Sequence, residues 1–139
     1  MFAYHGKRAF LAKFIMKIRI RGNTIRLRLS QTDIQQLNQD GIIKETTSFN
    51  LDHHFHYALQ IAENNEKITA DFQNNEIRII APLATANEWI QTDLVGISEE
   101  IPIGNNAFLS ILIEKDFQCL TERAGENEED NFPNPNISC

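Results

Sequence analysis

The sequence predicts an α+β protein in which a β-β-α-β-β unit occurs twice and forms an eight-stranded antiparallel barrel or strongly curled sheet with two short helices. Three observations lead to this prediction: a hydrophobic pattern that recurs at an offset of 52 residues, hairpin turn signals at matching positions, and two short helical segments between hairpins. A pattern that keeps its core and turn positions at a fixed period indicates a repeated supersecondary unit. We therefore expect two copies packed about a pseudo-twofold axis.

The match between the two units is one of pattern rather than identity. The aligned positions include Ile20 with Phe72, Asn23 with Asn75, Ile25 with Ile77, Arg26 with Arg78, Leu37 with Trp89, and Tyr57, Leu59 and Ile61 with Leu109, Ile111 and Ile113.

The first unit opens with a hairpin. Apolar and basic residues alternate from Lys17 to Leu29, and Gly22-Asn23 supplies the tight turn between two strands. Ser30 then caps a helix expected over 31–39, with Asp33 near the positive end of its dipole. Strands are expected over 42–49 and 52–61.

The second unit repeats this order. A hairpin is expected over 67–73 and 76–81 around Asn74-Asn75. Pro82 stands at a helix entry, where its missing N–H costs nothing, and the helix over 83–91 carries Trp89 inward. Strands near 94–97 and 108–114, with a turn at 104–106, complete the unit.

Composition divides the chain into three parts. Residues 16–118 are expected to form one duplicated domain, with repeat one over 16–62 and repeat two over 67–116. Residues 1–15 are a basic extension without strand alternation: either Met16 is the true start, or the extension is a short helix that docks on the body or on a partner. Residues 119–139 form an acidic tail.

The same composition limits the expected cellular location of the protein and the classes of molecule that it could bind. No run approaches the roughly 18 apolar residues of a membrane span and no secretory segment is evident, so we expect a cytoplasmic protein without membrane contact. Cys119 and Cys139 are then expected to be reduced thiols, and neither belongs to a zinc-type pair. Residues 1–28 carry eight Lys or Arg and no acid, yet the net charge is -6, which argues against nucleic-acid binding. The oligomeric state stays open.

The strongest candidate site is a set of arginines on one strand face, which a barrel would turn into its lining. Guanidinium groups offer planar donors that suit phosphate or carboxylate oxygens, and an anion would relieve their mutual repulsion. Two alternatives stay open: a solvated edge hairpin that prevents aggregation, or cover by the chain's own acidic tail, for which salt-dependent release is expected. The candidate ligand-binding residues are Arg19, Arg21, Arg26, Arg28 and Arg78.

Metal sites have weaker support in the sequence. His54 and His56 share a strand face, but no third ligand stands at a fixed spacing. Asp71 on the fifth expected strand, and Glu114 and Asp116 at alternate positions at the end of the eighth, are carboxylates that could converge on Mg or Mn. No glycine-rich phosphate loop or nucleophile motif is present, so the catalytic residues are unassigned.

Two resemblances follow from these segments. The opening MKIRIRGNTIRLRL from Met16, with the later IEKDFQCL and NFPNPN, resembles a small uncharacterised bacterial family over nearly the whole chain. The element order is also similar to the CYTH superfamily of triphosphate tunnel proteins, which includes thiamine triphosphatases and class IV adenylyl cyclases. That resemblance implies an eight-stranded tunnel that grips polyphosphate with basic side chains. Its ExExK metal-binding strand corresponds here to KIRIRG, which has no acid.

The sequence thus favours a protein that binds a phosphorylated or polyanionic small molecule through its arginine face. The first alternative is a CYTH-like triphosphatase that uses divalent metal, with Mg or Mn needed only in that case. The second is a non-enzymatic interaction module that recognises an acidic partner or dimerises.

Overall fold

The computed structural model describes residues 16–117, which contain two helices and eight strands in the predicted order. Expectations for residues 1–15 and 119–139, including Cys119 and Cys139, lie outside this range. The elements are β1 (Lys17–Arg21), β2 (Thr24–Leu29), α2 (Gln31–Asp40), β3 (Ile42–Ser48), β4 (His54–Ala62), β5 (Thr69–Gln73), β6 (Glu76–Pro82), α3 (Leu83–Gln91), β7 (Gly96–Gly104) and β8 (Ala107–Lys115).

Local signals account for the ends of most elements. The turn residues Asn74 and Asn75 have φ of 53° and 62°, and the turn after β7 has the same left-handed pair, as a primed hairpin turn requires. Ser30 and Asp33 form a reciprocal capping box at the start of α2. Gly41 ends α2 in a left-handed conformation with φ of 77°, which a residue without a Cβ adopts at least cost.

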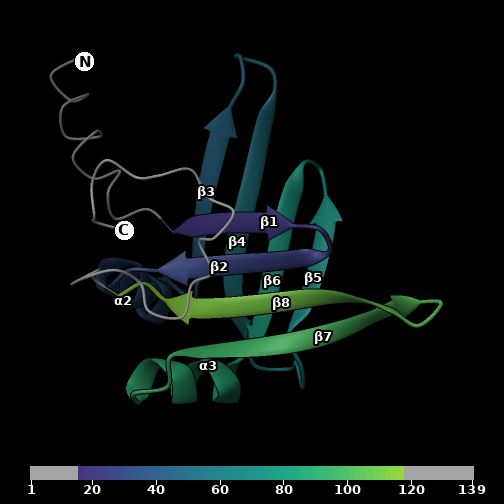
Figure 1. The fold of residues 1–139 in the computed structure, drawn as a ribbon. Helices are drawn as coiled ribbons and strands as arrows, with labels where there is room; N and C mark the ends of the chain where they lie inside the picture. Colours follow the sequence, from purple (N-terminus) through teal and green to yellow (C-terminus); the bar gives the residue numbers. More distant parts are fainter. Residues whose placement is uncertain (1–15, 118–139) are drawn as a thin grey trace, which may run out of the picture.

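The strands form two four-stranded sheets, and each sheet takes one hairpin from each unit. The front sheet in Figure 1 has the order β1-β2-β8-β7, and the rear sheet, whose strands run across it, has the order β3-β4-β6-β5. The central pairs β2 with β8 and β4 with β6 are parallel, whereas all hairpin pairs are antiparallel. The expected class, α+β with eight strands and two short helices, is confirmed, whereas the expected eight-stranded antiparallel barrel or strongly curled sheet is not fully met. Residues 16–117 form no closed barrel but two four-stranded sheets with parallel central pairs, because the hairpins of a unit separate at its helix.

Matching hydrogen bonds demonstrate the pseudo-twofold relation. Ser110 N–H donates to Asn23 O at 2.9 Å, and His56 N–H donates to Asn75 O at the same distance. The first hairpins correspond at an offset of 52 residues, as predicted. The second hairpins correspond at 54, since β3 begins at Ile42 and β7 at Gly96.

The predicted match of Leu59 with Ile111 is thus displaced by two residues, and Leu59 corresponds to Ile113. The connection before β7 has four residues against one before β3, and α3 is one residue shorter than α2, so the net shift is two residues. A shift of two preserves the side-chain face of a strand, which is why the hydrophobic pattern still aligned.

The inner faces of the two sheets pack against each other as an apolar core. Its largest fully buried side chains are Met16, Leu27, Leu29, Leu37, Leu59, Ile79, Trp89, Ile111 and Ile113. The arginines of β1 and β2 alternate with these positions and point away from them. The expected polar lumen is therefore absent from residues 16–117, because apolar side chains fill the space between the sheets.

The helices cover the core from two sides. α2 packs on β2, β3 and β4, and α3 packs on β4, β6 and β7. Leu37 and Trp89, at equivalent positions of the two helices, are each 1% exposed, as the sequence predicted. The Trp89 Nε1–H donates to Val95 O at 3.0 Å, which satisfies its polar atom. In the described region, neither helix has the length and apolarity needed to cross a membrane.

The assignment of inner and outer faces predicts a large and a small loss of stability for two neighbouring substitutions. Ile111→Ala removes a side chain that is 0% exposed and should cost about 2–5 kcal/mol in the free energy of unfolding. Leu112→Ala lies on the outer face beside Arg26 and should cost about 1 kcal/mol or less. Urea denaturation of both variants measures the difference. Equal losses would contradict the core described above.

Candidate functional site

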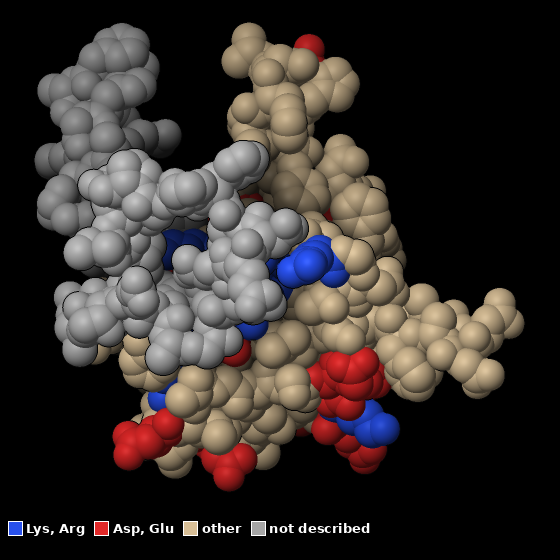
Figure 2. Space-filling model, in the orientation of Figure 1, with Lys and Arg blue, Asp and Glu red and all other residues tan. Residues whose placement is uncertain are grey.

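A cationic face lies on the outside of the front sheet. Because alternate residues of a strand point to opposite sides, the charged positions of β1 and β2 all project away from the core. Figure 2 shows Lys and Arg side chains over these two strands on the side turned to the viewer. We define the cationic face as Lys17, Arg19, Arg21, Arg26 and Arg28.

Two carboxylates from the end of β8 neutralise part of this face. Glu114 lies beside β2 in the parallel register, with Oε1 at 3.1 Å from Arg26 Nε and 3.7 Å from Arg28 Nε. Asp116 Oδ2 lies 2.8 Å from Lys17 Nζ. Gly96 lies opposite Glu114, and a Cβ at this glycine would come within 3.0 Å of Glu114 Cγ. The same Cβ would also come within 2.9 Å of the Ile113 carbonyl oxygen, so a glycine at this position lets β7 approach β8 closely beside Glu114.

The other two arginines of the cationic face, Arg19 and Arg21, form no ion pair with any residue of the described range. Arg19 and Arg21 are both exposed. Arg19 lies directly opposite Arg26 across β1 and β2, an arrangement of like charges that destabilises a strand pair. Two hollows of about 230 and 300 Å³ adjoin on this face and share Arg19 and Arg26 in their linings. The face therefore has unmatched positive charge beside open, concave space.

The structure places Arg78 elsewhere, so the expectation that five arginines share one face was wrong. Arg78 lies on β6 in the rear sheet, where its Nε donates to Glu76 at 2.7 Å and its Nη1 to Gln60 at 2.9 Å. Lys44 Nζ also lies 2.8 Å from Glu76. The unit that carries Arg78 contributes its first hairpin to the opposite sheet, which separates this residue from its sequence equivalent Arg26.

These rear-sheet residues line a mixed-charge groove of about 480 Å³ that is open to solvent. It is lined by Lys44, His56, Asp71, Gln73, Asn74, Glu76 and Arg78. Hydrogen bonds from Arg78 and then from Lys44 lower the pKa of Glu76 from 4.5 to about 2. The cations of this groove are already paired within the chain.

The carboxylates that might hold a metal are not brought together. Asp71 lies on β5 in the rear sheet, whereas Glu114 and Asp116 lie at the end of β8 in the front sheet. Residues 16–117 contain no group of three His, Cys, Asp or Glu side chains arranged for a metal ion.

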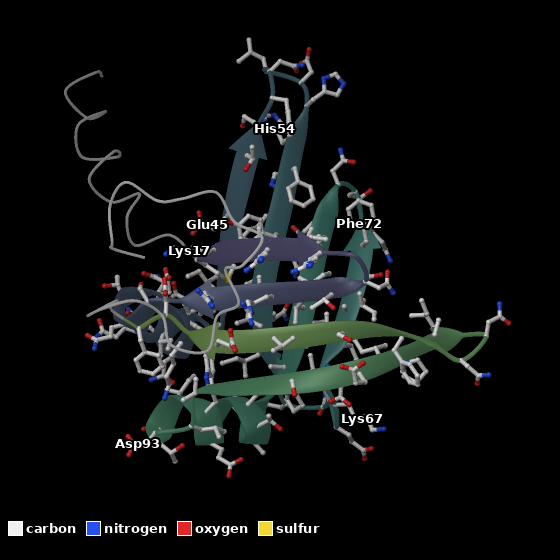
Figure 3. All side chains as sticks on the ribbon, viewed as in Figure 1. Lys17, Glu45, His54, Lys67, Phe72 and Asp93 are labelled. Atoms are coloured by element: carbon white, nitrogen blue, oxygen red, sulfur yellow. The ribbon has the colours of Figure 1, made fainter. Side chains whose placement is uncertain are left out.

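The two histidines instead bond to the neighbouring strand. His56 Nδ1 lies 2.8 Å from Thr46 Oγ1, and His54 Nδ1 lies 2.8 Å from Ser48 Oγ. Their rings stack at 6.1 Å between centroids. Figure 3 places His54 toward the far end of the β3–β4 hairpin, away from Lys17.

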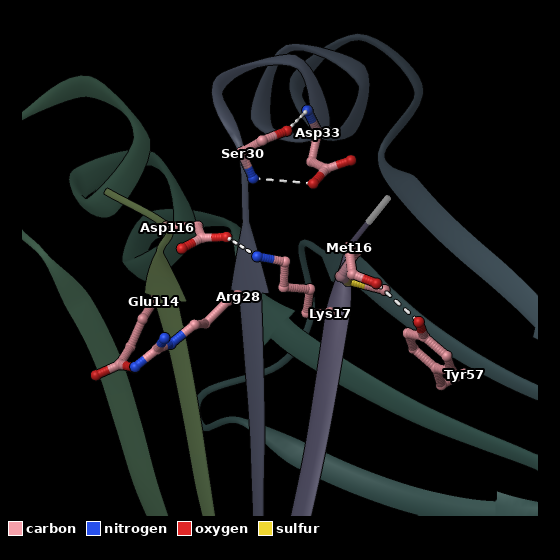
Figure 4. A network of polar contacts seen from close by, with 8 residues as sticks. All are labelled: Met16, Lys17, Arg28, Ser30, Asp33, Tyr57, Glu114 and Asp116. Atoms are coloured by element: carbon pink, nitrogen blue, oxygen red, sulfur yellow. Dashed lines mark hydrogen bonds and ion pairs between the residues drawn. The ribbon is translucent and has the colours of Figure 1, made fainter. Parts of the chain in front are cut away.

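A buried polar cluster anchors the start of β1 (Figure 4). Met16 is 0% exposed, and its carbonyl accepts a hydrogen bond from Tyr57 Oη at 2.7 Å. Burial raises the pKa of Asp33 and of Glu45, and for Glu45 the nearby Asp33 charge acts in the same direction. The cluster holds Lys17, the first residue of the cationic face, next to Asp116.

Sequence reasoning did not identify the carboxylates that form ion pairs with Arg26, Arg28 and Arg78. Glu114 was considered only as a metal ligand, and Glu76 was not considered at all. For Glu76 a signal existed, because it stands two residues before Arg78 and so shares its strand face. For Glu114 no local signal existed, since its partners Arg26 and Arg28 are more than eighty residues away in the sequence.

The Glu76 ion pairs predict a defined pH dependence of stability. A carboxyl whose pKa falls on folding stabilises the native state above its unfolded pKa and loses that effect as pH falls from 4.5 toward 2. Glu76→Gln should therefore lower stability at pH 7 and make no difference near pH 2. Urea denaturation across this range measures the gap. Glu66→Gln, an exposed change outside the groove, is the control, and a gap that stays constant with pH would contradict the assignment.

Comparison with known proteins places the chain in a family without assigning an activity. Neither the curated proteins nor the solved structures contain a significant match to this sequence. The predicted likeness to the CYTH tunnel proteins therefore finds no support among solved structures, and the packed core leaves no tunnel between the two sheets. Residues 16–136 match a family model described as a family of unknown function, DUF7009. The chain belongs to this uncharacterised family.

Proposed function

We propose that this protein is a non-enzymatic binding protein whose cationic face takes up a phosphorylated or otherwise polyanionic small molecule. The observation that carries the proposal is the pair Arg19 and Arg21, which are exposed and unmatched among residues 16–117, beside the hollows that Arg19 and Arg26 line. Arg19 and Arg26 are opposite each other in the strand register, and an anion between them would accept charge-assisted hydrogen bonds from both.

The pseudo-twofold relation provides an internal comparison. Arg19 faces Arg26 in the front sheet, and the equivalent pair in the rear sheet is Asp71 and Arg78. The same position in the fold thus holds an opposite-charge pair in one sheet and a like-charge pair in the other. Both strand pairs form, so the fold does not require an arginine at position 19 opposite Arg26. Binding of an anionic ligand would account for an arginine there.

The placement of carboxylates argues against the triphosphatase alternative. Such an enzyme needs acids that hold a divalent metal next to the arginines, yet Asp71 is in the other sheet and Glu114 is engaged with Arg26 and Arg28. The interaction module has more support. Within residues 16–117 the cationic face is open rather than enclosed, so an acidic segment of another protein could lie along it.

The test uses tripolyphosphate as the probe and follows the thermal stability of the protein. A ligand that binds only the native state raises the unfolding temperature by mass action. Arg19→Gln/Arg21→Gln should weaken binding by about tenfold or more, since each charged hydrogen bond contributes roughly 1.5–3 kcal/mol. Arg78→Gln is the matched control because it removes a guanidinium from the other sheet. Its affinity should equal that of the unaltered protein.

Other outcomes separate the alternatives. No thermal shift with tripolyphosphate, or equal shifts in all variants, would overturn the proposal. Phosphate release only in the presence of Mg or Mn would favour the triphosphatase. A mass in solution that rises with concentration, without any ligand shift, would favour the interaction module. Weakening of tripolyphosphate binding by salt is expected, because the contacts are exposed.

A further inference from the structure

The described chain ends beside the cationic face, and its last acids already lie on it. β8 runs parallel to β2, and beyond it the Asp116 N–H donates to Leu29 O at 2.8 Å. The Asp116 carboxylate pairs with Lys17 at 2.8 Å, and Glu114 pairs with Arg26 and Arg28. The chain therefore continues from Phe117 at the edge where these basic residues begin.

The sequence after that point is complementary in charge to the part of the face that stays unmatched. Residues 118–139 carry five acids and one basic residue, Arg123. The acids are Glu122, Glu126, Glu128, Glu129 and Asp130. Five of the chain's acids thus lie within a short segment that continues from the Lys17 end of the cationic face. Arg19 and Arg21, the two arginines without an ion pair in the described range, lie farther along the same strand.

The attachment point also gives this segment sufficient reach. The five residues that follow Phe117, ending at Glu122, span at most about 17 Å when extended. The cationic row from Lys17 to Arg21 is four strand residues long, or about 13 Å. Glu122 can therefore reach any cation of the face. A tethered segment also has an effective concentration in the millimolar range, which gives it an advantage over a free acidic partner.

We propose that the acidic segment 122–130 of this same chain lies on the cationic face through Arg19 and Arg21 and is displaced when an anionic ligand binds. The inference rests on the proposed anion site and adds regulation to it: the ligand competes with an internal counterion. Ligand binding then has two effects, occupation of the face and release of the segment.

The test follows cleavage after Glu122 and Glu126 by a glutamyl endopeptidase and needs no ligand. Cleavage of the full chain should be about fivefold faster at about 0.5 M salt than at low salt, because salt weakens exposed ion pairs. In Arg19→Gln/Arg21→Gln, cleavage should be fast under both conditions, which also corrects for any salt effect on the protease. Arg78→Gln is the matched control and should behave like the unaltered chain. Equal rates at both salt concentrations in the unaltered chain would overturn the inference.

Two further arms distinguish this inference from the proposed function. First, tripolyphosphate should accelerate cleavage at low salt. Second, neutralisation of the five tail acids should tighten tripolyphosphate binding by about tenfold. The control neutralises five exposed acids elsewhere and should leave the affinity unchanged: Asp52, Glu63, Glu66, Glu88 and Asp93. Salt-dependent protection without tripolyphosphate binding would support the docked segment and refute the proposed ligand. Tripolyphosphate binding without salt-dependent protection would support the proposed ligand and refute the docked segment. Protection that grows with protein concentration would identify the segment of a second copy and overturn the intrachain form.

Discussion

The parallel pairing of β2 with β8 and of β4 with β6 is the constraint on which the rest of this structure depends. Each pair joins the two units, so neither unit builds a sheet alone, and the inner faces of the two sheets become one apolar core. Leu27 and Ile113, and Leu59 and Ile79, are partners in these central pairs and are at most 1% exposed. Because apolar side chains fill the space between the sheets, the lysines and arginines of β1, β2 and β6 lie on the outer faces.

The two outer faces share a backbone arrangement but differ in their charge. In the rear sheet, Glu76 accepts from both Lys44 and Arg78, which leaves the cations satisfied within the chain. In the front sheet, Glu114 and Asp116 pair with Lys17, Arg26 and Arg28, and the more distant Arg19 and Arg21 remain exposed. The outer face of the rear sheet therefore has its cations paired with Glu76, whereas the outer face of the front sheet has positive charge without a counterion in residues 16–117. That difference, rather than any enclosed pocket, is what makes the front sheet the candidate site.

The features that were predicted correctly are those encoded within a few residues. Alternation predicted the hairpins, paired asparagines predicted their turns, and Ser30 with Asp33 predicted the start of α2. The features that were not predicted depend on residues far apart in the chain. Arg78 and Arg26 occupy equivalent positions in the two sequence repeats, yet they lie in different sheets. Glu114 and Arg26 are distant in sequence, yet they form an ion pair.

By itself, therefore, the amino-acid sequence determined the duplication, the eight strands, the two short helices and which side of each strand is apolar, because side-chain alternation and turn chemistry act locally. Only the tertiary structure decided which hairpins share a sheet, whether the arginines face a lumen or solvent, and which of them have carboxylate partners. The physical reason is that a strand with one apolar side can satisfy that side equally well in a barrel or in a two-sheet core. The choice between them is made by pairing between distant strands.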